Sequence, residues 1–426
     1  MRDALACGRE QLLKQGHSEC ANVPSYATLV ATRMLRVFES SALTNAGHGA
    51  NLNEFGHVEC EASVVCGKTN LVAACASMRG VAEPSALAMR LLSQAAEAEG
   101  QGEVKANGGA DLSERTKEPQ QFAFGRQAPL VVVGEHTKTL AHLDAYQVSA
   151  KAKSYWKKWD ARFQSVHTGE MESCNKAKPG LSQSEQLPPD SRMTKETTAS
   201  RDSEGAEDEE ADFLLDTVGV ICMDPAGNIA AALSSGGVAY KVPGRVGLAG
   251  CPRIGCNASN VRDSGRDHKT RKRKRKATDE ATARNGFGVA CTGRGEHFIR
   301  SGFTSILSRS LGKGRTLEKA FRKAFMEGRE ENGNVPIEGG VLALTVSRSH
   351  KDPNDSTSTA HRGEYKASLD IQLGAAFTTP CMGVGFLHSD ADASPKVQIL
   401  RKPPVSKQAG KYSECELSTH ISFLRL

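Results

Sequence analysis

Apolar residues recur at helical spacing in several parts of the chain. The clearest case lies near the start, where Val30, Met34, Val37 and Phe38 share one face of a predicted helix. A proline at position 84 opens another segment, as is typical of a first helical turn. The segments predicted to be helices are 3–16, 24–39, 84–95, 304–311 and 316–327.

Short β-prone runs bounded by turn residues predict strands. These runs are 59–65, 130–134, 218–223, 229–233, 341–346, 368–377 and 382–388. The third and fourth are joined by Asp-Pro-Ala-Gly-Asn, whose residues supply turn dihedrals, so they are expected to form a hairpin. The apolar run at 130–134 is expected to be a buried strand. Strands and helices in separate blocks predict an α+β fold in which helices pack on sheets.

Two polar stretches interrupt these elements. The stretch 150–212 is dense in Lys, Glu, Ser and Thr and contains Lys-Pro-Gly and Leu-Pro-Pro-Asp, so a flexible, disordered linker is predicted there. A second stretch, about 257–285, is predicted to be a basic insertion. The remaining residues suffice for one layered domain built from two halves, 1–149 and 217–426.

Composition narrows the functional classes. The net charge of +6 is the small difference between 55 basic and 49 acidic residues, which argues against a global basic field. Twelve cysteines are too dilute for a disulfide scaffold and lack matching Cys-x-x-Cys pairs, so reduced thiols and no metal or other cofactor are expected. The chain has no apolar window of about eighteen residues, and its first residues carry charges throughout. A soluble, intracellular protein with no membrane partner is therefore expected.

Thr217 is the candidate nucleophile. An internal threonine hydroxyl is a poor nucleophile, whereas an N-terminal threonine supplies its own base, an α-amine with a pKa near ~8. The acidic segment SEGAEDEEADFLLD leads into Thr217 and a predicted strand leads out of it. Threonine at the start of a strand is common, so an ordinary structural role remains the alternative on spacing alone.

Three motifs resemble the type 2 asparaginase family of N-terminal nucleophile hydrolases. They are DTVGVICMDPAGNIAAALSSGGVAYKVPGRVG, TNAGHGANLNEFGHVECEAS and CTGRGEHFIR, and the resemblance covers most of residues 3–149 and 212–402 in matching order. Within the family, the chain is most similar to the threonine aspartases. The resemblance implies a four-layer αββα sandwich, and cleavage between Asp216 and Thr217 that leaves an α chain and a β chain, with 213–216 as the cleavage segment.

The same resemblance assigns roles around the nucleophile. Thr217 corresponds to the family nucleophile, and Ser235 to a hydroxyl residue that supports it. Asn45, together with Thr292 and Gly293, corresponds to the donors of an oxyanion hole, where each preorganised donor contributes about 3 kcal/mol. Without the family, Asn45 could equally serve a cap or turn, and Ser235 a bend.

Two further residues correspond to the substrate pocket. Arg245 matches the residue that binds a substrate carboxylate. A planar guanidinium can form two parallel hydrogen bonds with such a group. Gly295 lines the same pocket. An arginine without this context is more often a solvated surface charge.

Members of the family differ in the class of substrate that they cleave. Two sequence positions distinguish the members that act on small amides from those that cleave proteins. Small-molecule asparaginases and isoaspartyl peptidases have Gly before the nucleophile and an acidic residue three positions after the arginine, where this chain has Asp216 and Leu248. A pocket without that carboxylate has no partner for a free α-ammonium group. Protein substrates cut after an apolar residue and Asp, as in Leu215-Asp216, are therefore expected. The alternatives are an asparaginase or isoaspartyl peptidase and an inactive relative.

A run of six basic residues suggests a separate role in localisation. Its charge and the absence of aromatic interleaving favour a nuclear localisation signal, read by an import receptor, over nucleic-acid binding. A solvated loop is the structural alternative. We therefore expect the protein in nucleus and cytoplasm. The run comprises Arg271, Lys272, Arg273, Lys274, Arg275 and Lys276.

The chain departs from the family at its start. Relatives begin with a strand carrying a His-Ala-Gly-Ala-Gly type segment, whereas this sequence passes from Met1 into the first predicted helix. A fold lacking the first strand is therefore expected, and either an incomplete sequence or an inactive relative would explain it. Arg294 also stands where asparaginases often have His. The resemblance further implies an αβ heterodimer that pairs into a dimer of heterodimers.

Overall fold

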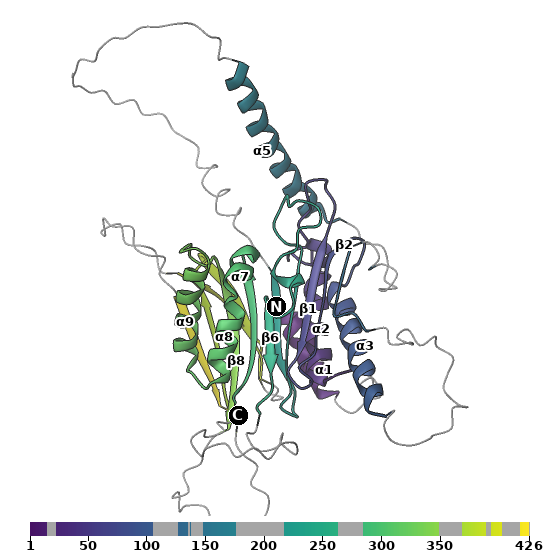
Figure 1. The fold of residues 1–426 in the computed structure, drawn as a ribbon, viewed down its shortest axis with the longest axis vertical. Coiled ribbons are helices and arrows are strands. Elements are labelled where there is room, and N and C mark those ends of the chain that lie inside the picture. Colours follow the sequence, from purple (N-terminus) through teal and green to yellow (C-terminus); the bar gives the residue numbers. More distant parts are fainter. Residues whose placement is uncertain are drawn as a thin grey trace, which may run out of the picture.

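The computed structural model contains two five-stranded sheets with helices packed on them (Figure 1). One sheet has the strand order β3-β2-β1-β5-β4 and the other β12-β9-β8-β7-β6. The predicted α+β class is confirmed by this mixture of sheets and helices. The residues that the structure describes are 1–14, 23–104, 127–134, 137, 148–175, 217–262, 284–348, 369–388, 393–402 and 418–425.

The first sheet carries Thr217 at the start of its last strand. Its strands are β1 (Cys60–Cys66), β2 (Val72–Met78), β3 (Val131–Val133), β4 (Val218–Met223) and β5 (Ile229–Ser235). The predicted hairpin is confirmed, because β4 pairs antiparallel with β5 in a register that sets Val218 opposite Ser234. β5 also pairs antiparallel with β1. Among the strands described, β4 therefore lies at an end of the sheet.

The second sheet is antiparallel throughout its described pairings. It comprises β6 (Cys256–Ser259), β7 (Gly286–Gly293), β8 (Gly339–Arg348), β9 (Leu369–Phe377) and β12 (Ser418–Arg425). A separate two-stranded ribbon is formed by β10 (Cys381–Phe386) and β11 (Lys396–Arg401).

Four of the described helices pack on the two sheets. On the first sheet, α2 contacts β4 and β5 and α3 contacts β1 and β2, while α8 and α9 pack on the second sheet (Figure 1). Ser25 caps α2 by accepting a hydrogen bond from Thr28 N, which satisfies one of its free amides. The helices are α1 (Arg2–Leu13), α2 (Tyr26–Glu39), α3 (Pro84–Val104), α5 (Ala150–Asn175), α7 (Gly295–Ser301), α8 (Phe303–Gly312) and α9 (Leu317–Glu331).

Strand β5 is buried on both of its faces. Its alternate residues belong to two hydrophobic clusters, with Ala230 and Ala232 on the helix side and Ala231 and Leu233 on the side of the second sheet. Small side chains on this strand allow both neighbouring layers to approach closely. The hairpin that positions Thr217 is thus part of the core of the fold.

Three expectations from the sequence are wrong. The run at 130–134 is an exposed edge strand, with Val131 and Val133 41% and 58% exposed, because β3 pairs only with β2 at the end of the sheet. The expected linker begins with the helix α5, which is anchored by the buried Ala152 and projects from the body of the fold (Figure 1). The expected insertion at 257–285 begins with most of β6, which pairs with β7.

Some expectations concern residues outside the described ranges. These are the cleavage residue Asp216, the rest of the expected linker at 176–212, and the basic run Arg271–Lys276. In the part of the chain that the structure describes, no helix is long and apolar enough to cross a membrane.

Candidate active site

The β4–β5 hairpin brings the hydroxyl groups of Thr217 and Ser235 together. Thr217 Oγ1 lies 3.1 Å from Ser235 Oγ, although the residues are 18 positions apart in sequence. Ser235 Oγ also accepts a hydrogen bond of 3.0 Å from Gly237 N. A hydroxyl oxygen can accept two hydrogen bonds and donate one, so either Thr217 or Ser235 can be the donor of the bond that joins them. The bond from Gly237 N holds Ser235 Oγ beside the hydroxyl of Thr217.

The two glycines after Ser235 form a bend that only glycine can make without strain. Gly237 has φ +67°, in the left-handed region. A Cβ on Gly236 would lie 2.4 Å from Asn45 Oδ1. The bend is therefore defined both by its backbone conformation and by the close approach of the segment around Asn45.

Asn45 holds this bend. Its Nδ2 donates to Gly237 O at 2.8 Å, its Oδ1 accepts from Asn51 N at 2.8 Å, and its backbone carbonyl accepts from Gly236 N at 2.8 Å. Asn51 Nδ2 adds a second donor to Gly237 O at 2.9 Å. One Asn45 amide proton is thereby committed to the bend, so its contribution to an oxyanion hole would come through the other.

Lys241 supports the bend from inside the protein. Its Nζ is buried and donates to Glu59 O at 2.6 Å and to Gly236 O. Burial lowers the pKa of Lys241, while the nearby Cys60 and Glu61 act in the opposite direction. The sequence alone gave no indication of this role, since an isolated lysine in a loop is usually solvated.

Two carboxylates at the start of β1, Glu59 just before the strand and Glu61 within it, bind the loop that carries Arg245. Glu59 Oε2 accepts from Gly244 N at 2.9 Å, and Glu61 Oε2 accepts from Gly247 N at 2.6 Å. Both glutamates are buried, and burial raises the pKa of Glu61. Their spacing of two residues places them on one face of an extended segment, a pattern in VECEAS that could have indicated a shared role.

A small cavity is lined by most of the site residues predicted from the resemblance. Thr217, Ser235 and Arg245 lie on it, together with Asn45, Gly293 and Gly295. Thr292 is not among the residues that line it and instead faces a neighbouring cavity. Residues that the sequence had not singled out as pocket-lining complete the wall: Glu61, Gly237 and Val238.

Leu248 also lines this cavity, next to the Arg245 loop. It is 2% exposed and occupies the position where the acidic residue of small-amide hydrolases was expected. The cavity is therefore apolar at that point. Its remaining carboxylate, Glu61, is already bonded to Gly247 N.

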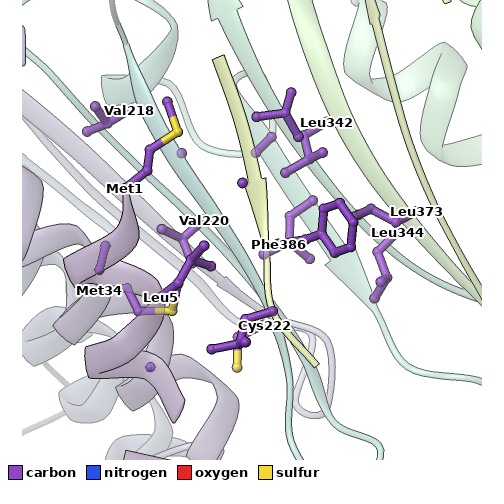
Figure 2. Close-up of a pocket in the computed structure, with 18 of the residues that line it drawn as sticks. Met1, Leu5, Met34, Val218, Val220, Cys222, Leu342, Leu344, Leu373 and Phe386 are labelled. Atoms are coloured by element: carbon purple, nitrogen blue, oxygen red, sulfur yellow. The ribbon is translucent and has the colours of Figure 1, made fainter. Parts of the chain in front are cut away.

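A larger apolar cavity adjoins the site along β4. Thr217 lines both cavities, so the nucleophile stands at their junction. Figure 2 shows Met1, Leu5 and Met34 on one side of the space and Leu342, Leu344, Leu373 and Phe386 on the other, with Val220 and Cys222 of β4 between them. Val218, at the start of β4, also lines the cavity. The cavity thus lies beside β4, the strand that directly follows Thr217.

The cysteines near the site are poor candidates for nucleophiles. Burial raises the pKa of Cys60 to about 12 and the pKa of Cys75 well above its ordinary value. The reactive form of cysteine is the thiolate, so both side chains remain protonated thiols near neutral pH. Within the described ranges, no group of three or more His, Cys, Asp or Glu side chains could hold a metal ion.

Comparison with known proteins relates this geometry to a family. The family model described as asparaginase matches residues 9–102 and 148–262. An isoaspartyl peptidase of Salmonella typhimurium is 30% identical over 171 residues, covering 40% of this chain and 43% of the relative. A Drosophila persimilis protein described as a candidate N(4)-(beta-N-acetylglucosaminyl)-L-asparaginase is 26% identical over 220 residues, covering 50% and 46%.

A shorter match has a higher sequence identity. A plant-type L-asparaginase of Pyrobaculum calidifontis is 51% identical over 47 residues, covering 11% of this chain and 16% of the relative. The chain thus spans less than half the length of each of these curated relatives. The comparisons support the membership of this chain in the asparaginase family of N-terminal nucleophile hydrolases.

Proposed function

We propose that this chain is the precursor of a threonine endopeptidase that cleaves itself before Thr217 and then cleaves protein substrates after Asp. The observation that supports this most is the pair of hydroxyl groups at Thr217 and Ser235, 3.1 Å apart, on the cavity that Arg245 lines. The names of the relatives support amide hydrolysis in general.

In the first step, Thr217 Oγ1 attacks the carbonyl carbon of Asp216. The C–N bond breaks as the C–O bond forms, the hydroxyl proton passes to the nitrogen, and an ester joins Asp216 to the threonine side chain. Water then hydrolyses the ester and restores the hydroxyl. The released α-amine of Thr217 is the base that accepts the hydroxyl proton in each later turnover.

Substrate binding follows from the charges around the cavity. Arg245 would pair with the side-chain carboxylate of the substrate aspartate, and Gly295 leaves space beside it. Asn45 and Gly293 line this cavity and would supply donors to the developing oxyanion, and Thr292 would reach it from the adjoining cavity, which Thr217 also lines. Leu248 disfavours a free α-ammonium group, because a buried cation without a partner is destabilised. An internal peptide segment, whose amine is already acylated, avoids that penalty.

The second candidate is an asparaginase or isoaspartyl peptidase. The names of the Salmonella and Pyrobaculum relatives favour it, and so does Glu61, a carboxylate on the same cavity. In this alternative Glu61 would be the group that meets the substrate ammonium. A third possibility, an inactive relative, is tested by the same assays.

Incubation of the processed protein with both substrate classes separates these candidates. The proposal predicts cleavage of a peptide copied from residues 213–221 after its aspartate, and slow or no release of ammonia from asparagine. Ammonia release without peptide cleavage would contradict it and support the second candidate. A Thr217→Ala variant is the control for contaminating activity.

The other inferences from the resemblance are also proposals. Helices on the outer face of each of two facing sheets support the four-layer αββα arrangement. After cleavage, an α chain and a β chain would remain associated and pair into a dimer of heterodimers, which analytical ultracentrifugation can test. The basic run Arg271–Lys276 would direct nuclear import. Its replacement by alanines should move the protein to the cytoplasm while leaving peptide cleavage unchanged; unaltered nuclear entry would refute this.

A further inference from the structure

The guanidinium group of Arg245 is held by a carboxylate from a distant part of the chain. Glu296, on the first turn of α7, accepts hydrogen bonds from Arg245 Nε at 2.9 Å and from Nη2 at 2.8 Å through Oε1. Nη2 also donates to Glu296 Oε2 at 2.8 Å. The side-on edge of the guanidinium, formed by Nε and Nη2, is therefore occupied.

The other edge of the guanidinium faces three glycines. A Cβ on Gly247 would lie 2.6 Å from Arg245 Nη1, a Cβ on Gly237 would lie 2.9 Å from the same atom, and a Cβ on Gly295 would lie 3.2 Å from Nη2. Gly237 and Gly295 also line the cavity that contains Thr217. The end-on edge, formed by Nη1 and Nη2, thus lies at the cavity wall beside these glycines, with the Glu61 carboxylate as its neighbour on the same cavity.

The backbone and the side chain of Arg245 are positioned independently. Glu59 and Glu61 bind the amides of Gly244 and Gly247 on either side of it, which fixes the loop. They do not fix the guanidinium, which lies at the end of a long flexible side chain whose ordering has an entropic cost. The Arg245 side chain is 16% exposed and the Glu296 side chain is 51% exposed, so Glu296 is the more solvent-exposed member of the pair.

We infer that Glu296 is a positioning residue, which occupies the side-on edge of Arg245 so that its end-on edge is presented to the carboxylate of a substrate aspartate. This inference rests on the function proposed above and names the residue that sets its selectivity for Asp. Nη2 is shared with both oxygens of Glu296, so the hydrogen bonds to a substrate carboxylate on the end-on edge would come mainly from Nη1. Without Glu296 the guanidinium could rotate away, and binding of the charged substrate would weaken.

Kinetics on two peptides tests the inference. The first is copied from residues 213–221, and the second has Asn in place of Asp216. Glu296→Ala is expected to raise KM for the aspartate peptide on the order of 10- to 100-fold, with a much smaller change in kcat, because displacement of a binding group by about 1 Å can have that effect. The preference for Asp over Asn should fall by a similar factor. Glu296→Gln, which keeps a carbonyl oxygen as acceptor, should lie between Glu296→Ala and the unaltered protein.

Glu338 provides a matched control. It pairs with Arg294, two positions before Glu296, at 3.0 Å, and it does not line the Thr217 cavity. Glu338→Ala should leave KM and the preference for Asp unchanged. Thermal unfolding of each variant shows whether the fold is retained. An unchanged KM and preference in folded Glu296→Ala, or equal losses in Glu338→Ala, would overturn the inference.

A binding measurement separates this inference from the proposed function. If the unaltered protein cuts neither peptide, the proposed endopeptidase activity fails. The inference is then judged by calorimetric affinity for the tetrapeptide Phe-Leu-Leu-Asp relative to Phe-Leu-Leu-Asn. A preference for the aspartate peptide that Glu296→Ala abolishes supports the role of Glu296. No preference in the unaltered protein, or the same preference in the variant, overturns it.

Discussion

Replacement of Glu39 by Gln is expected to stabilise the protein above neutral pH. Glu39 is the last residue of α2 and is 1% exposed. Its carboxylate accepts hydrogen bonds from Ser85 N at 2.9 Å and Ser85 Oγ at 2.8 Å, at the start of α3. Among the described residues no basic side chain forms an ion pair with it. Burial raises the pKa of Glu39 from 4.5 to about 7.

Because the folded-state pKa of Glu39 is raised, its carboxyl group makes the protein less stable as the pH rises. A carboxyl group with a raised folded-state pKa contributes most to stability below its unfolded pKa, and the contribution is lost as the pH rises through the folded pKa. The difference between 4.5 and about 7 corresponds to roughly 3 kcal/mol at about pH 8. Gln has nearly the same shape and no charge, so Glu39→Gln should remove most of this penalty.

Urea unfolding at about pH 5 and about pH 8, followed by circular dichroism, measures the effect. Relative to the unaltered protein, Glu39→Gln should gain roughly 2 kcal/mol more at the higher pH than at the lower. Glu83→Gln is the control, since Glu83 pairs with Arg36 at the surface and such pairs contribute less than about 1 kcal/mol. An equal effect of Glu39→Gln at both pH values would refute the reasoning.

Three further substitutions test the site. Ser235→Ala should slow self-cleavage at least about tenfold, because a hydroxyl that supports the nucleophile is lost; an unchanged rate on denaturing gels would exclude that role. Gly237→Ala should cost about 1–2 kcal/mol through its left-handed backbone and should weaken peptide cleavage by crowding Arg245; a fully active variant would count against the tight bend. Lys241→Met should lower the free energy of unfolding by about 3 kcal/mol in thermal unfolding, since two backbone carbonyls lose their donor. An unchanged free energy of unfolding would contradict the role of Lys241 as the donor that holds the bend.

The sequence was sufficient to predict the hairpin that carries Thr217. Its β-branched runs favour strands and its Asp-Pro-Ala-Gly-Asn segment favours a turn. These local preferences agree with the pairing of the two strands in the fold. Strands β2 and β7 could not be predicted in this way, because VAACASM and GFGVACTG are made mostly of small residues with weak β-propensity. The structure shows why they are small. A Cβ on Gly288 of β7 would lie 2.4 Å from Ile221 Cγ2 of β4, so glycine permits the two sheets to approach.

The candidate site was predictable in part. The structure brings Thr217, Ser235 and Arg245 together as the resemblance implied, although their catalytic roles remain predictions. The partners of these residues were not predictable, because Lys241 binds the carbonyl of Glu59, and Glu296 binds Arg245, between segments distant in sequence. Such contacts leave no local pattern in the chain. Only the alternating glutamates of VECEAS provided a readable indication, through their common face.

The central claim is that Thr217 is a nucleophile which becomes an N-terminus. Intact mass spectrometry and N-terminal sequencing of the purified full chain test it directly. The proposal predicts two chains, the second beginning at Thr217, and a single uncut chain for Thr217→Ala. A full-length protein that remains uncut after prolonged incubation, or a Thr217→Ala variant that still splits at this bond, would contradict the account.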